Sequence, residues 1–152
     1  MLKRVIAISL VFLFGVSVLG LSQGSYEEFY RDYITSMASQ IEADASKLDG
    51  LLDSWQNKEI AQSDVVRKLE EMEKKADSYF AGVLRLSPPE GEFQRHKQTV
   101  YVFVTWSTII GMFTEGMADI DIAKLDAAVA LSNYFERQVN EFDGEMLDTE
   151  LD

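Results

Sequence analysis

The feature that most constrains the fold of this chain is the uncharged stretch between Lys97 and Glu115. Within 99–117, apolar side chains recur at alternating spacings of three and four residues, which is the period of one face of an α-helix. These side chains are Phe103, Trp106, Ile110, Phe113 and Met117. Valines and isoleucines flank this face, so most of the circumference is apolar. Because such a helix must be enclosed by several neighbours, we predict that 99–117 is the buried central helix of a small bundle.

Two other interpretations of this stretch remain open. Val100, Val102 and Val104 alternate with other residues, and β-branched and aromatic side chains favour strands. The uncharged run also lies near the lower length limit for a membrane-spanning helix, about 17 residues. The helical spacing continues beyond the alternation to Met117, and several threonines interrupt the apolar run. Both observations favour a buried helix over a strand or a second membrane span.

The N-terminus carries the pattern of a targeting segment. Lys3 and Arg4 precede an apolar run over 5–21, and the small residues Ser22 and Gly24 follow it. This order is typical of a signal peptide with a cleavage site after one of the small residues. The apolar run is long for a signal core, so an uncleaved membrane anchor is the alternative. In both cases we predict that the rest of the chain is exported, to the periplasm or outside the cell.

Three further amphipathic segments accompany the central one. Apolar side chains step by three or four residues over 25–56 and 63–86, and again from Asp119 or Asp121 to about Phe142. Pro88 and Pro89 separate the second segment from the third, which we expect to start near Pro89. Short connections favour antiparallel neighbours. We therefore predict an all-α fold, an antiparallel up-down-up-down four-helix bundle.

The predicted domains are a leader or anchor over 1–24, the bundle over 25–142 and a tail over 143–152. The tail is rich in Asp and Glu with a glycine near its start, so we predict that it is frayed or disordered. The predicted faces of the outer helices follow from the spacing. They are Tyr26, Tyr30, Tyr33, Met37, Ile41, Ala45, Leu48, Leu52 and Trp55, then Val65, Leu69, Met72, Ala76, Tyr79, Val83 and Leu86, and then Leu125, Ala128, Ser132, Phe135, Val139 and Phe142.

Polar residues suggest the helix ends and a charged outer surface. Ser25 and Ser63 are predicted N-caps, because their side chains can accept from backbone N–H groups of the first turn. Glu70 with Lys74, and Glu71 with Lys75, have the spacing of favourable pairs on one helix face. The charged run that contains them is therefore predicted to be a solvated face.

Composition excludes several classes of function. The chain has 14 Lys and Arg residues against 26 Asp and Glu residues, a formal net charge of −12. An acidic protein of this kind repels nucleic-acid phosphates and anionic headgroups. The absence of Cys excludes disulfides, thiol chemistry and Cys-based metal sites.

No catalytic or cofactor motif is present. His96 is the only histidine, whereas zinc and iron sites usually need more than one His or Cys. Phe93 stands where the Glu-x-x-His motif of di-iron bundles requires a glutamate. Asp119 and Asp121 fit helix capping better than a calcium loop, because Ala123 occupies a ligand position. We expect no cofactor and no metal, and a rim histidine with Glu92 within reach of its ring.

The resulting hypothesis is an exported, non-enzymatic bundle that binds or scaffolds a partner in the bacterial cell envelope. The alternative is an extracytoplasmic sensor that holds a small cationic or apolar molecule near Tyr30, Tyr33, His96 and Trp106. We expect no nucleic-acid partner, and membrane contact only through 1–24 if that segment is uncleaved. The order of elements carries no motif from which the activity of a known family can be transferred.

Overall fold

The computed structural model describes residues 25–149, with side chains over 26–138. This part of the chain forms four helices and no strand: α2 at Ser25–Gln56, α3 at Gln62–Leu84, α4 at Phe93–Asp119 and α5 at Ile122–Thr149. The all-α prediction is therefore confirmed, and the strand interpretation of 99–117 is wrong. The predicted leader and the last three residues lie outside the described part.

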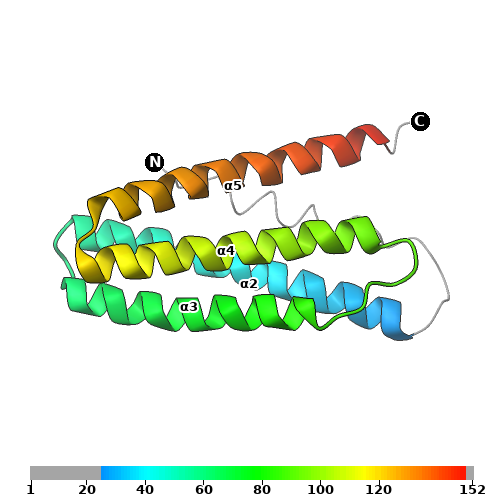
Figure 1. The fold of residues 1–152 in the computed structure, drawn as a ribbon, viewed down its shortest axis with the longest axis horizontal. Helices are drawn as coiled ribbons and strands as arrows, with labels where there is room; N and C mark the ends of the chain where they lie inside the picture. Colours follow the sequence, from blue (N-terminus) through cyan, green and yellow to red (C-terminus); the bar gives the residue numbers. More distant parts are fainter. Residues whose placement is uncertain (1–24, 150–152) are drawn as a thin grey trace.

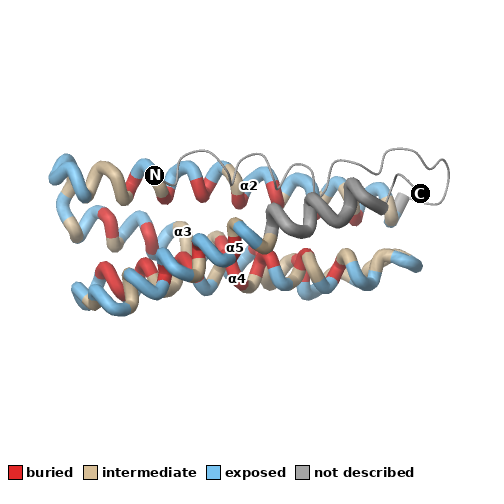
Figure 2. The backbone as a smooth tube through the Cα atoms, turned by 90° about the horizontal axis from the view of Figure 1, so that it is seen from above, coloured by how far each residue is buried: buried red, intermediate tan, exposed pale blue. Residues whose placement is uncertain are grey.

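The helices form a bundle in which consecutive helices run in opposite directions (Figure 1). α4 packs against α3 and against α5, while α2 packs mainly against α3. Seen from above, the buried residues of α2 lie on the side that faces the other helices (Figure 2). The core therefore lies between α2, α3 and α4, and α5 packs against α4.

α4 is the central helix, as its composition predicts. All five residues of its predicted apolar face are buried: Phe103, Trp106, Ile110, Phe113 and Met117. Val102 and Ile109 beside them are 1% exposed, so neighbours enclose the helix on more than one side. By length and composition alone α4 could also cross a membrane, but 56% of its most apolar window is buried in the protein. A core helix of a soluble protein passes the same test, which makes this weak evidence for a span.

α2 has the predicted bounds, and it continues through Gly50 without a break. Its buried face differs from the prediction. Tyr30, Ile41, Ala45 and Leu48 are buried as expected, but Ile34, Ala38 and Leu51 are buried where Tyr33, Met37 and Leu52 were predicted, and those three are only partly buried. Two overlapping apolar faces start at Tyr30, and spacing alone does not choose between them.

The starts of α3 and α4 also differ from the prediction. α3 begins at Gln62 with Ala61 at the N-cap, so Ser63 is not the cap. In the first turn of α3, the side-chain amide of Gln62 donates to the backbone carbonyl oxygen of Met117 at 2.6 Å. α4 begins at Phe93, because Gly91 has a φ of 85° that a right-handed helix cannot accommodate. Pro89 therefore lies in the connection and not in the first turn.

α5 begins as predicted and ends later. The Asp121 carboxylate accepts from the Lys124 backbone N–H at 3.0 Å, so Asp121 caps the helix. The helical backbone extends past Phe142 to Thr149, over most of the segment predicted to be a disordered tail. Good helix formers (Glu, Met and Leu) are frequent in this segment, and they outweigh the single glycine there.

Candidate functional site

Two of the four predicted ligand-binding residues, one near the start of α2 and one in the first turn of α4, meet in the structure. The Tyr30 hydroxyl lies 2.9 Å from His96 Nδ1, and the ring centroids are 5.9 Å apart. Tyr30 is 2% exposed and His96 9% exposed. With the imidazole proton on Nε2, the hydroxyl donates to Nδ1. The prediction of a packed, hydrogen-bonded rim histidine is confirmed.

Burial shifts the pKa values of both groups away from ionisation. Desolvation, reinforced by the Glu92 carboxylate, raises the pKa of Tyr30 to about 12. Desolvation also lowers the pKa of His96 below its usual value of 6.5. Both side chains are therefore neutral near pH 7, and their contact is a hydrogen bond between uncharged groups.

Glu92 does not bond to the His96 ring, contrary to the prediction from spacing. Its carboxylate accepts from Arg95 Nη1 at 3.0 and 3.2 Å, and it lies 3.8 Å from Arg31 Nη2. Two guanidinium groups compete for this carboxylate with a neutral ring, and charge-assisted bonds are the stronger ones.

The other two predicted residues lie elsewhere. The Tyr33 hydroxyl packs against Gly82 of α3, which leaves no room there for a Cβ. Trp106 is 3% exposed and follows His96 by about 15 Å along α4, at 1.5 Å per residue. The structure thus joins Tyr30 to His96 and leaves Tyr33 and Trp106 apart from them. Ligand binding at these four residues stays a prediction.

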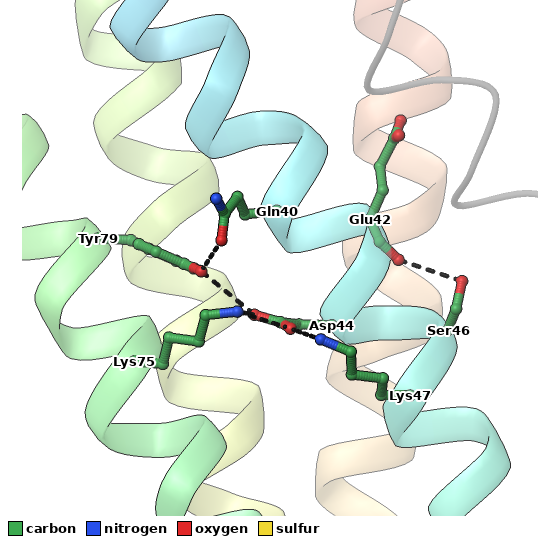
Figure 3. A network of polar contacts seen from close by, with 7 residues as sticks. All are labelled: Gln40, Glu42, Asp44, Ser46, Lys47, Lys75 and Tyr79. Carbon is green, nitrogen blue, oxygen red and sulfur yellow. Dashed lines mark hydrogen bonds and ion pairs between the residues drawn. The ribbon is translucent and has the colours of Figure 1, made fainter.

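A second polar cluster lies between α2 and α3 and centres on the buried carboxylate of Asp44 (Figure 3). The Asp44 side chain is 5% exposed. Lys75 Nζ donates to both of its oxygens at 2.9 and 3.0 Å, and Lys47 Nζ donates at 2.9 Å. The Tyr79 hydroxyl donates to Gln40 at 2.7 Å and lies 3.5 Å from Asp44.

This Asp44 cluster is saturated by its own members. Desolvation opposes the charge of Lys75, but hydrogen bonds with Tyr79 and Asp44 outweigh it and raise the pKa of Lys75. The Asp44 carboxylate already accepts bonds from two lysines. The chemistry of the cluster is to join two helices.

The cluster also corrects the predicted charge pairing on α3. Glu71 pairs with Arg67 at 3.1 Å, and Lys75 is drawn across to α2 by Asp44. Asp44 was not among the predicted site residues, although a charged residue between Ile41 and Leu48 on the apolar face is a usable signal in the sequence.

The turn between α4 and α5 has an unusual residue at its centre. Ile120 lies in the left-handed region, with φ 55° and ψ 39°, and its side chain is 67% exposed. The next backbone N–H, that of Asp121, donates back to the Gly116 carbonyl at 2.9 Å. Helices often end in this way, but glycine usually occupies the left-handed position. Ile122, which is 61% exposed, places a second apolar side chain beside the turn.

Acidic residues surround these two isoleucines in the sequence and in the turn. Asp119 and Asp126 are exposed, and Asp121 is partly so. The one lysine of the turn, Lys124, is bonded to Glu115 at 2.8 Å. The surface here is apolar with an acidic rim, and sequence spacing gave no sign of it because the turn conformation of Ile120 creates it.

Among residues 26–138, no three His, Asp or Glu side chains are grouped so that they could hold a metal ion. The comparisons agree in finding no relative: no protein-family model, curated protein or solved structure matches this chain.

Proposed function

We propose that this protein is an exported, non-enzymatic helical bundle that binds or scaffolds a protein partner in the bacterial cell envelope. Export rests on the order of positive, apolar and small residues over 1–24. The absence of an enzymatic role is part of the proposal, and it is supported by the Asp44 cluster, whose members bond to one another and join two helices. The partner-binding surface is the turn between α4 and α5.

The observation that carries this proposal is the conformation of Ile120. A left-handed conformation costs an L-residue about 1–2 kcal/mol, and it is a clear outlier for a β-branched side chain. At 67% exposure, the side chain regains little of this cost by burial within the protein. Backbone strain that no contact within the protein offsets is common at functional sites. Ile120 and Ile122 therefore suit contact with a partner.

The acidic residues around Ile120 and Ile122 indicate the chemistry of that partner. Asp119 and Asp126 are exposed beside Ile120 and Ile122, and the one lysine of the turn, Lys124, already bonds to Glu115. A partner that offers an apolar pocket flanked by Lys or Arg would satisfy both kinds of group, and charge complementarity would also accelerate encounter.

Photo-crosslinking in the intact envelope tests this proposal. A photoreactive residue at Ala118, which is exposed next to the turn, should give one dominant protein adduct. Ile120→Gly should raise the free energy of unfolding by about 1 kcal/mol, because glycine tolerates the conformation, and yet should weaken the adduct severalfold. Val129→Ser, at an exposed site on α5, is the matched control. An undiminished adduct with Ile120→Gly would count against the proposal, as would enzymatic turnover by the purified protein.

The sensor alternative has one observation in its favour. Tyr30 and His96 form a buried neutral pair contributed by two helices, and a ligand with a donor and an acceptor could take the place of either group. A ligand at a hundred times its dissociation constant would stabilise the protein by about 2.7 kcal/mol. Thermal shifts across a panel of cationic and apolar metabolites that vanish in His96→Gln would favour this alternative over partner binding.

A further inference from the structure

The end of the bundle opposite the α4–α5 turn has an exposed apolar surface of its own. Tyr26, Phe29, Leu84 and Phe93 are 45%, 50%, 54% and 58% exposed. They come from the start of α2, the end of α3 and the start of α4, which lie at one end of the bundle (Figure 1). We call these four residues the aromatic end. Grouped exposed apolar side chains usually mark an interaction surface.

The rings of the aromatic end are held in place. The Tyr26 hydroxyl donates to the Ser87 carbonyl at 2.6 Å, which ties α2 to the connection between α3 and α4. The rings of Tyr26 and Phe29 are 6.3 Å apart, and Lys97 Nζ lies 4.9 Å from the centre of the Phe93 ring. The three rings therefore make specific contacts at this end of the bundle and remain exposed.

The sequence before α2 determines what lies near this end. The apolar run over 5–21 has 17 residues, the lower limit for a helix that crosses a bilayer. Only 22–24 separate it from Ser25, and an extended chain covers about 3.5 Å per residue, so the tether is about 10 Å long. The headgroup layer on each side of a bilayer is about 5–8 Å thick. If 5–21 stays in the membrane, the first turn of α2 is held within reach of the headgroups.

We propose that the aromatic end rests on the lipid bilayer that holds residues 5–21. Tyrosine is enriched at membrane–water interfaces, because its apolar ring and polar hydroxyl suit the headgroup layer, and phenylalanine adds apolar contact. The Lys97 ammonium group lies over the Phe93 ring, and its long side chain lets that group reach lipid phosphates. The acidic net charge opposes attraction to anionic lipid, so the tether and the rings drive the contact. This inference rests on the proposed export and on the uncleaved-anchor alternative for 5–21, and it points the α4–α5 turn away from the membrane.

The absence of Cys allows a direct test with single spin labels. The full chain is reconstituted in phosphatidylcholine vesicles with a label at Leu84→Cys, Phe93→Cys or Ile122→Cys. The labels at 84 and 93 should collide severalfold more often with lipid-soluble oxygen than the label at 122, and less often with an aqueous nickel complex. Equal exposure to water at all three positions would overturn the proposal. So would a chain isolated from bacterial membranes that begins after residue 24.

Two further arms make the test specific. Phe29→Ser combined with Phe93→Ser should return the label at 84 to water while circular dichroism remains helical, and Val129→Ser should leave that label in place. Adding phosphatidylglycerol should not deepen the labels, and a dependence on anionic lipid would contradict the proposed contact. The photo-crosslink at Ala118 reports on the partner alone, so loss of that adduct with unchanged label depths would reject the partner and keep the membrane contact.

Discussion

At the scale of single residues, His96 gives the protein a defined dependence on pH. Its folded pKa is lower than its unfolded value of 6.5, so the unfolded chain binds more protons between the two values. The free energy of unfolding should therefore fall as the pH decreases through 6.5, and this loss should level off below the folded pKa. Urea unfolding at about pH 7.5 and pH 5.5 should show a smaller difference for His96→Gln than for the parent. Equal differences would mean that His96 is not desolvated by folding.

The two lysines of the Asp44 cluster should differ in their contributions. Lys75 bonds both carboxylate oxygens from another helix, whereas the Lys47 side chain is 65% exposed and lies on the same helix as Asp44. We expect Lys75→Met to lower the free energy of unfolding by about 1 kcal/mol. This is less than the loss expected for a fully buried hydrogen bond between charged groups, because Lys75 is itself partly exposed. Lys47→Met should change it by less than about 0.5 kcal/mol. Equal losses in chemical denaturation would contradict the proposed joint between α2 and α3.

These residue-scale contacts also show what the sequence could not reveal. Tyr30 and His96 were both candidates, but their direct bond joins residues far apart in the chain and depends on how α2 and α4 pack. Asp44 was visible as a charge on an apolar face, yet its partner Lys75 was assigned to Glu71 because helical spacing reports only local neighbours. Helical spacing does not show whether a charged side chain bonds to a residue of its own helix or to one of a neighbouring helix.

At the scale of helices, two glycines inside helices should respond oppositely to alanine. A Cβ at Gly50 would meet no atom within 4 Å, whereas a Cβ at Gly116 would lie 2.9 Å from Leu125 Cδ2 and 3.3 Å from its backbone nitrogen. Gly50→Ala should stabilise α2 by about 0.5–1 kcal/mol. Gly116→Ala should be destabilising, because α5 must shift away from α4. Thermal melts of both variants test this, and a stabilising Gly116→Ala would show that the turn is loosely packed.

The same scale shows which features of the helices the sequence could predict and which it could not. In α2 and α4, long runs of apolar side chains at helical spacing predict a helix. Asp121 is an N-cap, as its residue type predicts. The face of α2 was ambiguous between Tyr33 and Ile34, because both continue an apolar spacing from Tyr30. The start of α4 depended on the positive φ of Gly91, which overrides the usual preference for proline in a first turn.

At the scale of the whole molecule, the two ends of the bundle differ in chemistry. One end carries the exposed rings of Tyr26, Phe29 and Phe93, and the other carries Ile120 and Ile122 with an acidic rim. The sequence contained all of these residues, but their division between opposite ends follows only from the antiparallel order of the helices (Figure 1). The proposed membrane contact and the proposed partner-binding turn would therefore lie at opposite ends of the bundle.

The net charge of −12 predicts how the stability of the whole protein depends on salt. Excess carboxylates repel one another more strongly in the compact state than in the unfolded chain. Raising NaCl from about 20 mM to about 300 mM shortens the Debye length from roughly 20 Å to roughly 6 Å, and so weakens this repulsion. Exposed pairs such as Arg67–Glu71 also weaken, but each contributes little, and the Asp44 cluster is shielded by burial.

We therefore expect the melting temperature to rise by about 2–4 °C over this range, equivalent to about 1 kcal/mol for a chain of this size. Choline chloride at the same ionic strength is the control, because a screening effect does not depend on the cation. A melting temperature that falls with salt would mean that attractive pairs, and not the excess of carboxylates, dominate the electrostatics of the folded protein.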